Sequence, residues 1–378
     1  MSTTPYHDAR PLLDSAAPRL GLLARVHLDG PLILGLLAIA GAGQVVLYSA
    51  TRQDLESVIR QGSRLGLGFA VMIALAQVPT QYLRRATPWI YLIGLLLLMA
   101  VLAFGDISMG AQRWLDLGFV RFQPSEIMKL GVPLMMAWHF ADKPLPPRLG
   151  HLLVGALVAG VPFVLIAKQP DLGTALVILS AGLFALFLGG IAWRIIIGLG
   201  AIAAVAAPLF WEYGMREYQR QRVRTLFDPE ADPLGAGYHI IQSKIAIGSG
   251  GIYGKGWLNG TQSHLEFLPE SHTDFILGTL AEEFGLIGVC ILLTLYFFVI
   301  TRALWLASRA PDTFGRITGG TLALVFFFYA FVNTGMVSGI LPVVGVPLPL
   351  VSYGGTSLVT IMAGFGILMG LHSHRPRT

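Results

Sequence analysis

Long apolar stretches, separated by short polar or Pro/Gly-rich breaks, follow one another along most of this 378-residue chain. A helix needs about 20 mainly apolar residues to span the hydrocarbon core of a bilayer, and most of these stretches approach that length. The pattern therefore predicts an all-α integral membrane protein of about ten transmembrane helices. We place them at residues 31–50, 65–82, 87–105, 125–141, 150–167, 173–190, 193–211, 275–300, 316–338 and 352–371.

The composition supports a membrane protein over a soluble one. Hydrophobic residues make up 54% of the chain and charged residues only 12%, whereas soluble domains carry roughly 25% charged residues. The formal charge of +5 comes from Lys and Arg residues scattered between the apolar stretches. Because they form no basic face, we expect no nucleic-acid partner. The single cysteine, Cys290, lies in an apolar stretch and offers no disulfide framework.

The distribution of Lys and Arg predicts the orientation of the chain. With a cytoplasmic N-terminus, thirteen of them lie inside and seven outside, if the long loop at 212–274 is set aside. Since Lys and Arg collect in short cytoplasmic loops, both termini are predicted inside and the 212–274 loop outside. The seven outer residues are Arg52, Arg60, Arg64, Arg113, Arg121, Lys129 and Lys168.

No small-residue cleavage site follows a short apolar core near the N-terminus, so we expect no removable signal peptide.

The segment from Gly339 to Gly355 is short, apolar and rich in proline. Irregular backbone is tolerated at membrane depth only where protein or water satisfies its polar groups. We therefore expect a re-entrant loop packed against protein.

Ionisable residues inside the predicted spans are costly and need a reason. Glu126 and Lys129 are spaced i, i+3 near the outer end of the fourth span, so they can pair on one helix face. Two interpretations stay open: a structural ion pair between helices, or the lining of a cavity for a charged head group. For Glu282 and Glu283, in the eighth span, helix packing and hydrogen bonding is the favoured role.

The outer loop ends in the run Leu268-Pro269-Glu270-Ser271-His272-Thr273-Asp274-Phe275, directly before an apolar helix. At this position Asp274 is either a helix N-cap or an acid at the membrane surface, close to basic groups that can hold a phosphate. Only the surrounding motif decides between the two. The basic residues of the loop are Arg216, Arg220, Arg222, Arg224, Lys244 and Lys255.

Two motifs in this region fail as binding sites. Residues 249–256 resemble a nucleotide-binding P-loop, but Ser249 replaces the first required glycine and Gly256 the final Ser or Thr. We interpret the segment as a flexible hinge. His264 and His272 lack helical ligand spacing and have no cysteine nearby, so we assign no transition metal.

The run from Trp257 to Glu283 resembles the signature of the SEDS family of peptidoglycan polymerases, in its RodA type. Ser271 takes a place that a basic residue often fills in the family. Five more motifs match in the expected order: Gln123-Pro124-Ser125-Glu126 with Lys129, Gln169-Pro170-Asp171-Leu172-Gly173-Thr174, Phe227-Asp228-Pro229, Ser249-Gly250-Gly251 and Ser352-Tyr353-Gly354-Gly355-Thr356-Ser357.

The resemblance implies a single polytopic domain at 31–371, between a cytoplasmic N-terminal segment at 1–30 and a cytoplasmic tail at 372–378. It implies a multi-pass protein of the bacterial cytoplasmic (inner) membrane that polymerises lipid II into glycan strands at the outer face, during cell elongation and rod-shape maintenance. A class B penicillin-binding protein would supply the transpeptidase, and other membrane proteins of the elongation complex are expected partners.

The resemblance also assigns residues. The essential acid of the family falls on Asp274, its intramembrane pair on Glu126 and Lys129, and polar positions of its outer cavity on Arg224 and Asp171. His272 and Thr273, the neighbours of Asp274 in the motif, are expected to contact substrate as well.

The residue types suit the chemistry. Asp274 is the candidate general base for a sugar hydroxyl that attacks the anomeric carbon of a second lipid-linked disaccharide. Arg224, Lys129 and Lys255 are candidates to balance the polyprenyl pyrophosphate that leaves. A divalent cation, Mg²⁺ or Mn²⁺, is expected from the family, and no organic cofactor. A single displacement on an α-linked donor predicts inversion.

Two other functions compete with a polymerase. A lipid II flippase also needs a polar cavity and many helices, but no internal repeat is visible and the polar chemistry concentrates outside. A non-catalytic scaffold for a penicillin-binding protein is the third hypothesis, and it predicts that Asp274→Asn leaves glycan synthesis intact.

Overall fold

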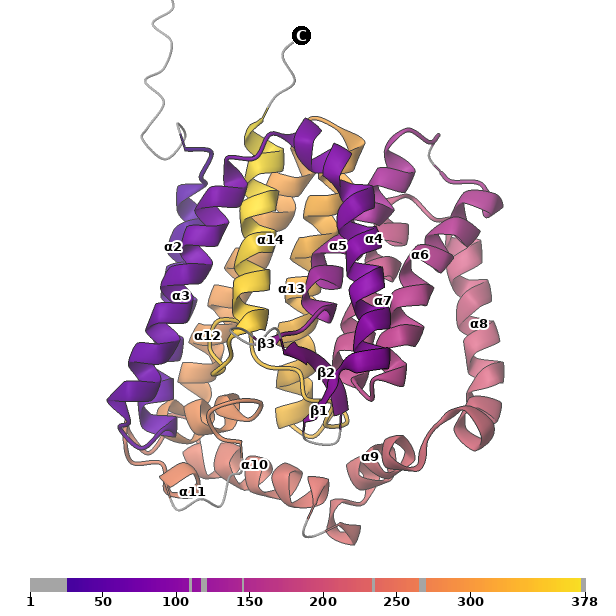
Figure 1. The fold of residues 1–378 in the computed structure, drawn as a ribbon. Helices are drawn as coiled ribbons and strands as arrows, with labels where there is room; N and C mark the ends of the chain where they lie inside the picture. The colour runs from indigo at the N-terminus through magenta and orange to yellow at the C-terminus, as the bar shows by residue number, and fades with distance from the viewer. Residues whose placement is uncertain are drawn as a thin grey trace, which may run out of the picture.

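The computed structural model describes residues 26–108, 111–116, 121–144, 146–232, 235–264 and 270–374. It is an α-helical bundle whose long helices run roughly parallel, with shorter helices lying across one end (Figure 1). The bundle helices are α2 (Gly30–Ala50), α3 (Leu55–Ala76), α4 (Thr80–Phe104), α5 (Ser125–Ala141), α6 (Leu149–Lys168), α7 (Leu172–Leu188), α8 (Trp193–Leu209), α12 (Ile276–Ser308), α13 (Thr313–Val337) and α14 (Thr356–Ser373).

Each of the ten apolar stretches forms a helix, which confirms the predicted all-α membrane fold. Within the described residues, eight helices are long and apolar enough to cross a bilayer, counting α8 together with the π-helical turn η1 (Phe210–Gly214) that extends it. The other two, α5 and α7, have 17 residues each. The count of ten spans therefore stays a prediction.

The predicted second span, 65–82, has the wrong bounds, because helix α3 occupies Leu55–Ala76. Asp54 caps its first turn by accepting from the backbone N–H groups of Glu56 and Ser57. Charged residues fill the following turns, where Glu56 pairs with Arg60 at 3.0 Å. A helix start rich in charge escapes a search for apolar runs, because the fold uses these turns outside the hydrocarbon core.

A small antiparallel sheet and several short helices form one end of the molecule (Figure 1). The sheet has strands in the order β1 (Asp106–Ser108), β2 (Ala111–Asp116) and β3 (Arg121–Phe122). The 212–274 loop is largely helical: α9 (Glu217–Phe227), η2 (Pro229–Ala231), α10 (Ala236–Gly250) and α11 (Thr261–His264). We call residues 210–264 the outer cap.

The two ends of the described chain meet at the opposite end of the bundle. The imidazole rings of His27 and His374 stack with their centroids 3.9 Å apart, and His27 Nδ1 lies 3.0 Å from Ser373 Oγ. The structure thus places both ends on the same side of the bundle, away from the outer cap (Figure 1).

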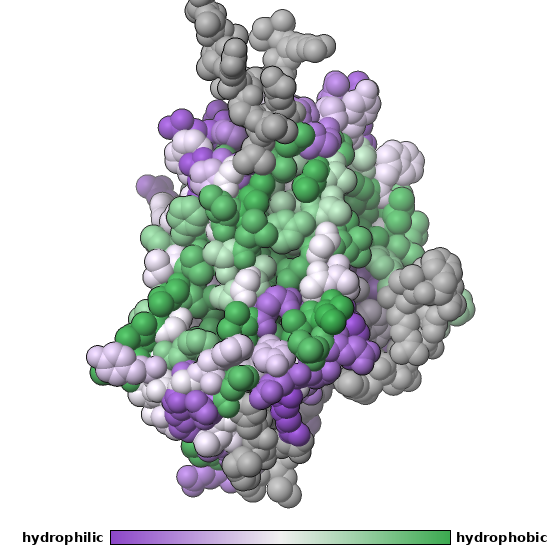
Figure 2. Space-filling view, turned by 90° about the vertical axis from the view of Figure 1, so that its left-hand side faces the viewer, coloured by the Kyte–Doolittle hydropathy of each residue, from purple (hydrophilic) through white to green (hydrophobic). Residues whose placement is uncertain are grey.

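The surface has the zonation of a protein that sits in a bilayer. Figure 2 shows hydrophobic side chains across the middle of one face and hydrophilic ones toward both ends. Helix α8 has no buried residue among those described, and it exposes large apolar side chains such as Ile197, Ile202 and Val205. Exposed apolar side chains on a long helix are satisfied by lipid, so this face belongs to the hydrocarbon zone.

Small residues let the helices approach closely, as is common in membrane bundles. A Cβ on Gly366 of α14 would lie 2.3 Å from the Met72 carbonyl of α3, and one on Gly182 of α7 would lie 2.3 Å from Ala159 Cβ of α6. Helix α13 is the most buried of the eight spanning candidates. Because it is buried among the other helices, α13 is a fixed support for the loops at the end of the bundle.

Residues 338–355, between α13 and α14, contain turns and no helix or strand. We call them the Pro-rich loop. Most of its large apolar side chains are buried, among them Val346, Leu348 and Leu350, while Ile340 is exposed. Its backbone is bonded to other segments of the protein, as described below. The loop is irregular and packs against protein, as expected, whereas its re-entry into the bilayer stays a prediction.

The prediction of a flexible hinge at 249–256 is wrong. Helix α12 breaks at Gly285, which has φ of +64°, and the break frees backbone groups that would otherwise bond within the helix. Residues 251–256 bond to them, because Lys255 N donates to Glu282 O at 3.0 Å and Leu286 N donates to Gly251 O at 3.0 Å. The segment is therefore tied to the broken helix.

Candidate functional site

Asp274 lies on a tight turn, residues 270–275, which we call the strap. The backbone N–H groups of Thr273 and Phe275 both donate to Glu270 O, at 3.1 and 3.2 Å. The Thr273 hydroxyl donates to Glu270 Oε2 at 2.6 Å. Glu270 itself has φ of +52°, a left-handed conformation that costs free energy for a non-glycine residue. The turn directs the chain into α12.

Asp274 does not cap α12, so the N-cap interpretation is wrong. The N-cap residue is Phe275, and the helix has no side-chain cap bond. Across the part of the chain that the structure describes, no hydrogen bond or ion pair engages the Asp274 carboxylate, while its backbone carbonyl accepts from the Asn333 side chain. A partly buried carboxylate without a partner is available to a ligand.

The surroundings of Asp274 favour its protonated form. Burial and the neighbouring Glu270 carboxylate raise the pKa of Asp274 to about 6, while the Arg222 guanidinium acts in the opposite direction. A carboxyl group whose pKa lies near neutrality is well matched to general acid–base chemistry.

The strap is bonded along its length to the Pro-rich loop. Ser352 Oγ donates to Thr273 O at 2.6 Å and accepts from Leu348 N at 2.8 Å. Tyr353 N donates to His272 O at 2.8 Å, and the two rings meet edge to face. The motifs that contain His272 and Ser352, far apart in sequence, thus form one wall. His272 and Thr273 contribute backbone oxygens to it.

Gly345 brings the Pro-rich loop against the acid itself. Its φ is +74°, which favours glycine, and an added Cβ would lie 3.6 Å from Asp274 Oδ2. The same loop reaches α7, because a Cβ on Gly173 would lie 2.6 Å from Val344 O. Asp171, the N-cap of α7, is thereby brought toward the strap.

Asp171 joins two of the sequence motifs. Its carboxylate accepts from Thr174 N and Gln123 Nε2, both at 3.2 Å, and lies 3.8 Å from Arg113 Nε. Arg113 also donates to Pro170 O at 2.9 Å. The segment that leads into the fourth predicted span and the start of α7 therefore meet at one buried carboxylate.

Arg222, on α9, completes the cluster and is a residue that the sequence did not single out. Its guanidinium interacts electrostatically with Asp171 and Asp274, and with Arg113 of the sheet. Burial lowers the pKa of Arg222, and its effect on that pKa is larger than the effect of any of these charges. Two arginines and two carboxylates from four separate segments thus gather beside the strap. Nothing in the sequence separates Arg222 from the other basic residues of the loop.

Gln61 and Arg64 of α3 were also missed. The buried Gln61 amide donates to Ser352 O at 3.1 Å and accepts from Gly354 N at 3.3 Å. Arg64 lies over the Tyr353 ring, with Cζ 4.7 Å from the centroid. Both residues lie in the part of α3 that the predicted span, 65–82, left out. The sequence pointed to Arg64 only as one of the seven basic residues predicted on the outer side.

Glu126 and Lys129 form a buried ion pair within α5. Lys129 Nζ lies 2.8 Å from Glu126 Oε1, and the two residues are 6% and 5% exposed. Lys129 also donates to Ser357 Oγ at 3.3 Å and lies over the Tyr329 ring. Through Ser357 the pair touches the motif that supports the strap.

Two predicted phosphate ligands lie elsewhere. Arg224 pairs with Glu217 on the exposed side of α9, at 2.9 Å, and its side chain is 53% exposed. Lys255 pairs with Glu282 at 2.7 Å. The structure brings neither residue to Asp274. Their role in substrate binding remains a prediction from the family resemblance.

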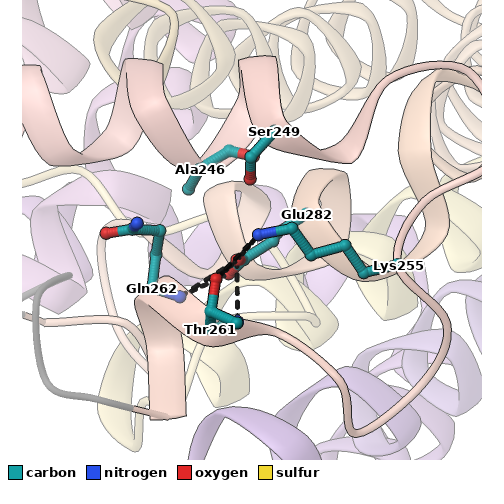
Figure 3. Close-up of polar contacts among 6 residues, drawn as sticks. All are labelled: Ala246, Ser249, Lys255, Thr261, Gln262 and Glu282. Atoms are coloured by element: carbon teal, nitrogen blue, oxygen red, sulfur yellow. Dashed lines mark hydrogen bonds and ion pairs between the residues drawn. The ribbon is translucent and has the colours of Figure 1, made fainter.

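Glu282 organises the segment around Lys255 (Figure 3). Its Oε1 accepts from Lys255 Nζ, Thr261 N, Thr261 Oγ1 and Gln262 N at 2.7–3.0 Å, although the side chain is 0% exposed. The carboxylate therefore caps the start of α11. The hydrogen-bonding role expected for Glu282 is confirmed.

Glu282→Ala should destabilise the protein by about 1–3 kcal/mol, because Lys255, Thr261 and Gln262 lose the charged acceptor of their hydrogen bonds. Thermal unfolding in detergent measures the loss. Glu230→Ala, at an exposed acid of the same cap, is the matched control and should unfold like the native protein. Equal stability of the two variants would contradict the stabilising role of the Glu282 carboxylate.

The site does not fit a metal held by the protein alone. Among the described residues, no three His, Cys, Asp or Glu side chains converge closely enough to hold an ion. Asp171 is already engaged with Arg113 and Gln123. The chemistry argued below takes no step through a metal.

Comparison with known proteins agrees with this architecture. A family model described as "Cell cycle protein", named for FtsW, RodA and SpoVE, matches residues 23–377. The chain is 55% identical to "Peptidoglycan glycosyltransferase MrdB" of Escherichia coli K12, over 93% of this chain and 95% of that protein. It is 36% identical to a "Probable peptidoglycan glycosyltransferase FtsW" of E. coli O6:H1, over 89% and 82%.

Solved structures give the same result. The chain superimposes on Thermus thermophilus RodA, "Rod shape determining protein", with a TM-score of 0.70 and 30% identity, covering 93% of this chain and 98% of that one. A chain from a study titled "Structural coordination of polymerization and crosslinking by a peptidoglycan synthase complex" matches with a TM-score of 0.79 and 34% identity, covering 91% and 97%. The protein therefore belongs to the FtsW/RodA/SpoVE family, the SEDS family of the sequence motifs.

Proposed function

We propose that this protein is a peptidoglycan glycosyltransferase of the RodA type, which polymerises lipid II into glycan strands during cell elongation. The observation that carries the proposal is the Asp274 carboxylate, which has no hydrogen-bond or ion-pair partner among the described residues, interacts electrostatically with Arg222 and lies on a strap of family motifs. The names of the relatives indicate the class of reaction, and Asp274 and Arg222 offer the acid–base group and the positive charge that it needs.

In the proposed reaction, Asp274 removes the proton from an acceptor sugar hydroxyl. The hydroxyl oxygen forms a bond to the anomeric carbon of the second disaccharide, and the bond from that carbon to the pyrophosphate oxygen breaks. The polyprenyl pyrophosphate leaves with the electron pair. A single displacement inverts the anomeric centre, so an α-linked donor gives a β-linked strand.

The leaving pyrophosphate needs positive charge where it develops. Arg222 and Arg113 are the cations that lie near the two carboxylates of the site, and we propose them as its first partners. Lys129, Arg224 and Lys255 were the earlier candidates. Lys129 stays one through its contact with Ser357, whereas the other two are paired away from Asp274.

A divalent cation remains a proposal that rests on the family alone. Mg²⁺ in phosphate chemistry takes one or two carboxylates and completes its shell with phosphate oxygens and water. Chelation followed by Mg²⁺ or Mn²⁺ readdition tests the requirement.

The pH dependence of polymerisation reports on Asp274. Because the base acts when deprotonated, the native rate should fall as pH drops through about 6, the pKa of Asp274. Arg222 lowers that pKa, so Arg222→Met should move the acid limb to higher pH. Arg224→Met, two residues away but paired with Glu217, is the control and should keep the native limb. An unmoved limb in both variants contradicts the proposed contact.

The protein is proposed to sit in the bacterial inner membrane with both termini in the cytoplasm and Asp274 at the outer face. The predicted charge bias supports this orientation, and so does the meeting of the two chain ends opposite the outer cap. A class B penicillin-binding protein is the proposed partner, along with other elongation-complex membrane proteins. The solved complex described as coordinating polymerisation and crosslinking supports such a pairing.

The function is tested with purified protein and labelled lipid II in detergent, where no sidedness exists. A ladder of glycan polymer on a gel is the expected result. Sealed vesicles test the competing hypothesis: movement of lipid II between leaflets without polymer would support a flippase. Absence of both activities would favour a scaffold.

A further inference from the structure

Asn333 of α13 joins the strap to the Pro-rich loop through one side chain. Its Nδ2 donates to Asp274 O and to Val346 O, both at 2.8 Å. The residue is 0% exposed, and its buried Oδ1 has no hydrogen-bond partner among the residues that the structure describes. One amide group therefore holds the backbone of the acid and the backbone of the Pro-rich loop.

The physical need for such a residue follows from the irregular backbone. Asp274 and Val346 lie outside any helix or strand, so their carbonyl groups require donors from elsewhere. An amide NH₂ group has two donor hydrogens and can serve both carbonyls. Because α13 is the most buried spanning helix, the donor comes from a fixed position.

The hydrogen bond from Asn333 to Val346 matters because Val346 is next to the residue that lies against Asp274. The neighbouring Gly345 is the backbone that lies against the Asp274 carboxylate, 3.6 Å from a built Cβ to Oδ2. By fixing Asp274 O and Val346 O together, Asn333 sets how closely the carboxylate faces that loop. It also keeps the carboxylate in the surroundings that raise its pKa.

We infer that Asn333 is a positioning residue for Asp274. It fixes the strap and the Pro-rich loop at the separation that the reaction needs. The inference rests on the proposed function, because it assigns Asn333 a role in the same reaction. A misplacement of reacting groups by about 1 Å can cost on the order of 100-fold in rate.

The charged and titratable groups around Asp274 must be considered when its titration is used as a readout. Glu270 and His272 lie on the strap, and Arg222 of α9 interacts electrostatically with the carboxylate. His239 of α10 stacks on Phe275. Burial lowers the pKa of His239, and the Glu270 carboxylate acts in the opposite direction. None of these is altered by a change at Asn333, so a shift of the titration reports on position.

The test compares Asn333→Leu with native protein in the lipid II assay. Leucine has a similar size and fills the space, but it donates no hydrogen bond. We expect a rate about 10- to 100-fold lower at the pH plateau. We also expect the acid limb at lower pH, because a loosened strap hydrates the carboxylate. Hydrogen–deuterium exchange should be faster in peptides covering 270–275 and 345–353.

Thr321→Val is the matched control. Thr321 is also fully buried on α13, and its hydroxyl has no partner among the described residues. This variant should keep the native rate and pH limb. If Asn333→Leu fails to fold, Asn333→Ser replaces it, because serine is too short to reach both carbonyls and should show the same changes in smaller measure.

A native pH limb and native exchange in the variant would overturn the inference, even if the rate falls, since a general packing defect lowers the rate without moving the titration. The proposed function fails separately. If native protein makes no polymer, or Asp274→Asn makes it at the native rate, the assigned reaction or base is wrong. Exchange in the strap still reports whether Asn333 holds it.

Discussion

Asp274→Asn is expected to lower the rate of lipid II polymerisation about 10²- to 10⁴-fold, the usual contribution of a general base. The amide has nearly the same shape as the carboxylate but does not accept the proton of the attacking hydroxyl. Because the Asp274 carboxylate makes no hydrogen bond or ion pair within the described residues, its loss should leave the fold intact. The strap is held through backbone groups of residues 272–274, which the substitution keeps.

Gel analysis of polymer formed by equal amounts of folded protein measures this effect. Glu230→Gln is the control, since Glu230 is an exposed carboxylate of the outer cap and should polymerise like native protein. Thermal unfolding of Asp274→Asn should match or exceed that of the native protein, because a buried acid with a raised pKa is relieved of its charge. Strand synthesis at the native rate by Asp274→Asn would refute the role of base.

Lys129→Met is expected to destabilise the protein by about 3–5 kcal/mol, because it leaves the buried Glu126 carboxylate without its counter-charge. Glu126 is 5% exposed, and within the described part of the chain its other oxygen, Oε2, already lacks a hydrogen-bond partner. Unfolding in detergent, followed by heat or denaturant, measures the loss. Arg84→Met is the control: Arg84 pairs with Asp142, whose side chain is 73% exposed, and such pairs contribute about 0–1 kcal/mol.

The double variant Glu126→Gln/Lys129→Met separates structure from function. Replacing both partners of a buried pair by neutral groups of similar size is often close to neutral for stability. A stable but inactive double variant would support a role in substrate handling, and a stable, active one would make the pair purely structural. If Lys129→Met alone unfolds like native protein, the pair is not the buried, coupled one described here.

The fold was largely predictable because each helix must satisfy the bilayer by itself. Apolar length determines a transmembrane helix locally, and the stretches at 150–167 and 316–338 agree with α6 and α13 within a few residues. The error at α3 arose where charged residues extend a helix beyond the hydrocarbon core. The hinge predicted at 249–256 was wrong because the segment pairs with the break in α12 at Gly285, about 30 residues away along the chain, and this tertiary pairing determines its structure.

The site was predictable only in part. Asp274 was reached through its motif, and its neighbours His272 and Thr273 came with it. Arg222 and Arg224 are two residues apart on one helix and chemically identical, so composition and spacing do not separate them. Helical geometry turns one toward the carboxylates and the other toward Glu217.

By itself the sequence determined the membrane helices, the family motifs and the acid at the start of α12, since hydropathy and short motifs are local properties of the chain. Only the tertiary structure decided which groups support that acid. Asn333, Gln61 and Ser352 act through hydrogen bonds between segments separated by up to about 290 residues. Such contacts exist only once the helices have packed, and they hold the backbone on which Asp274 lies.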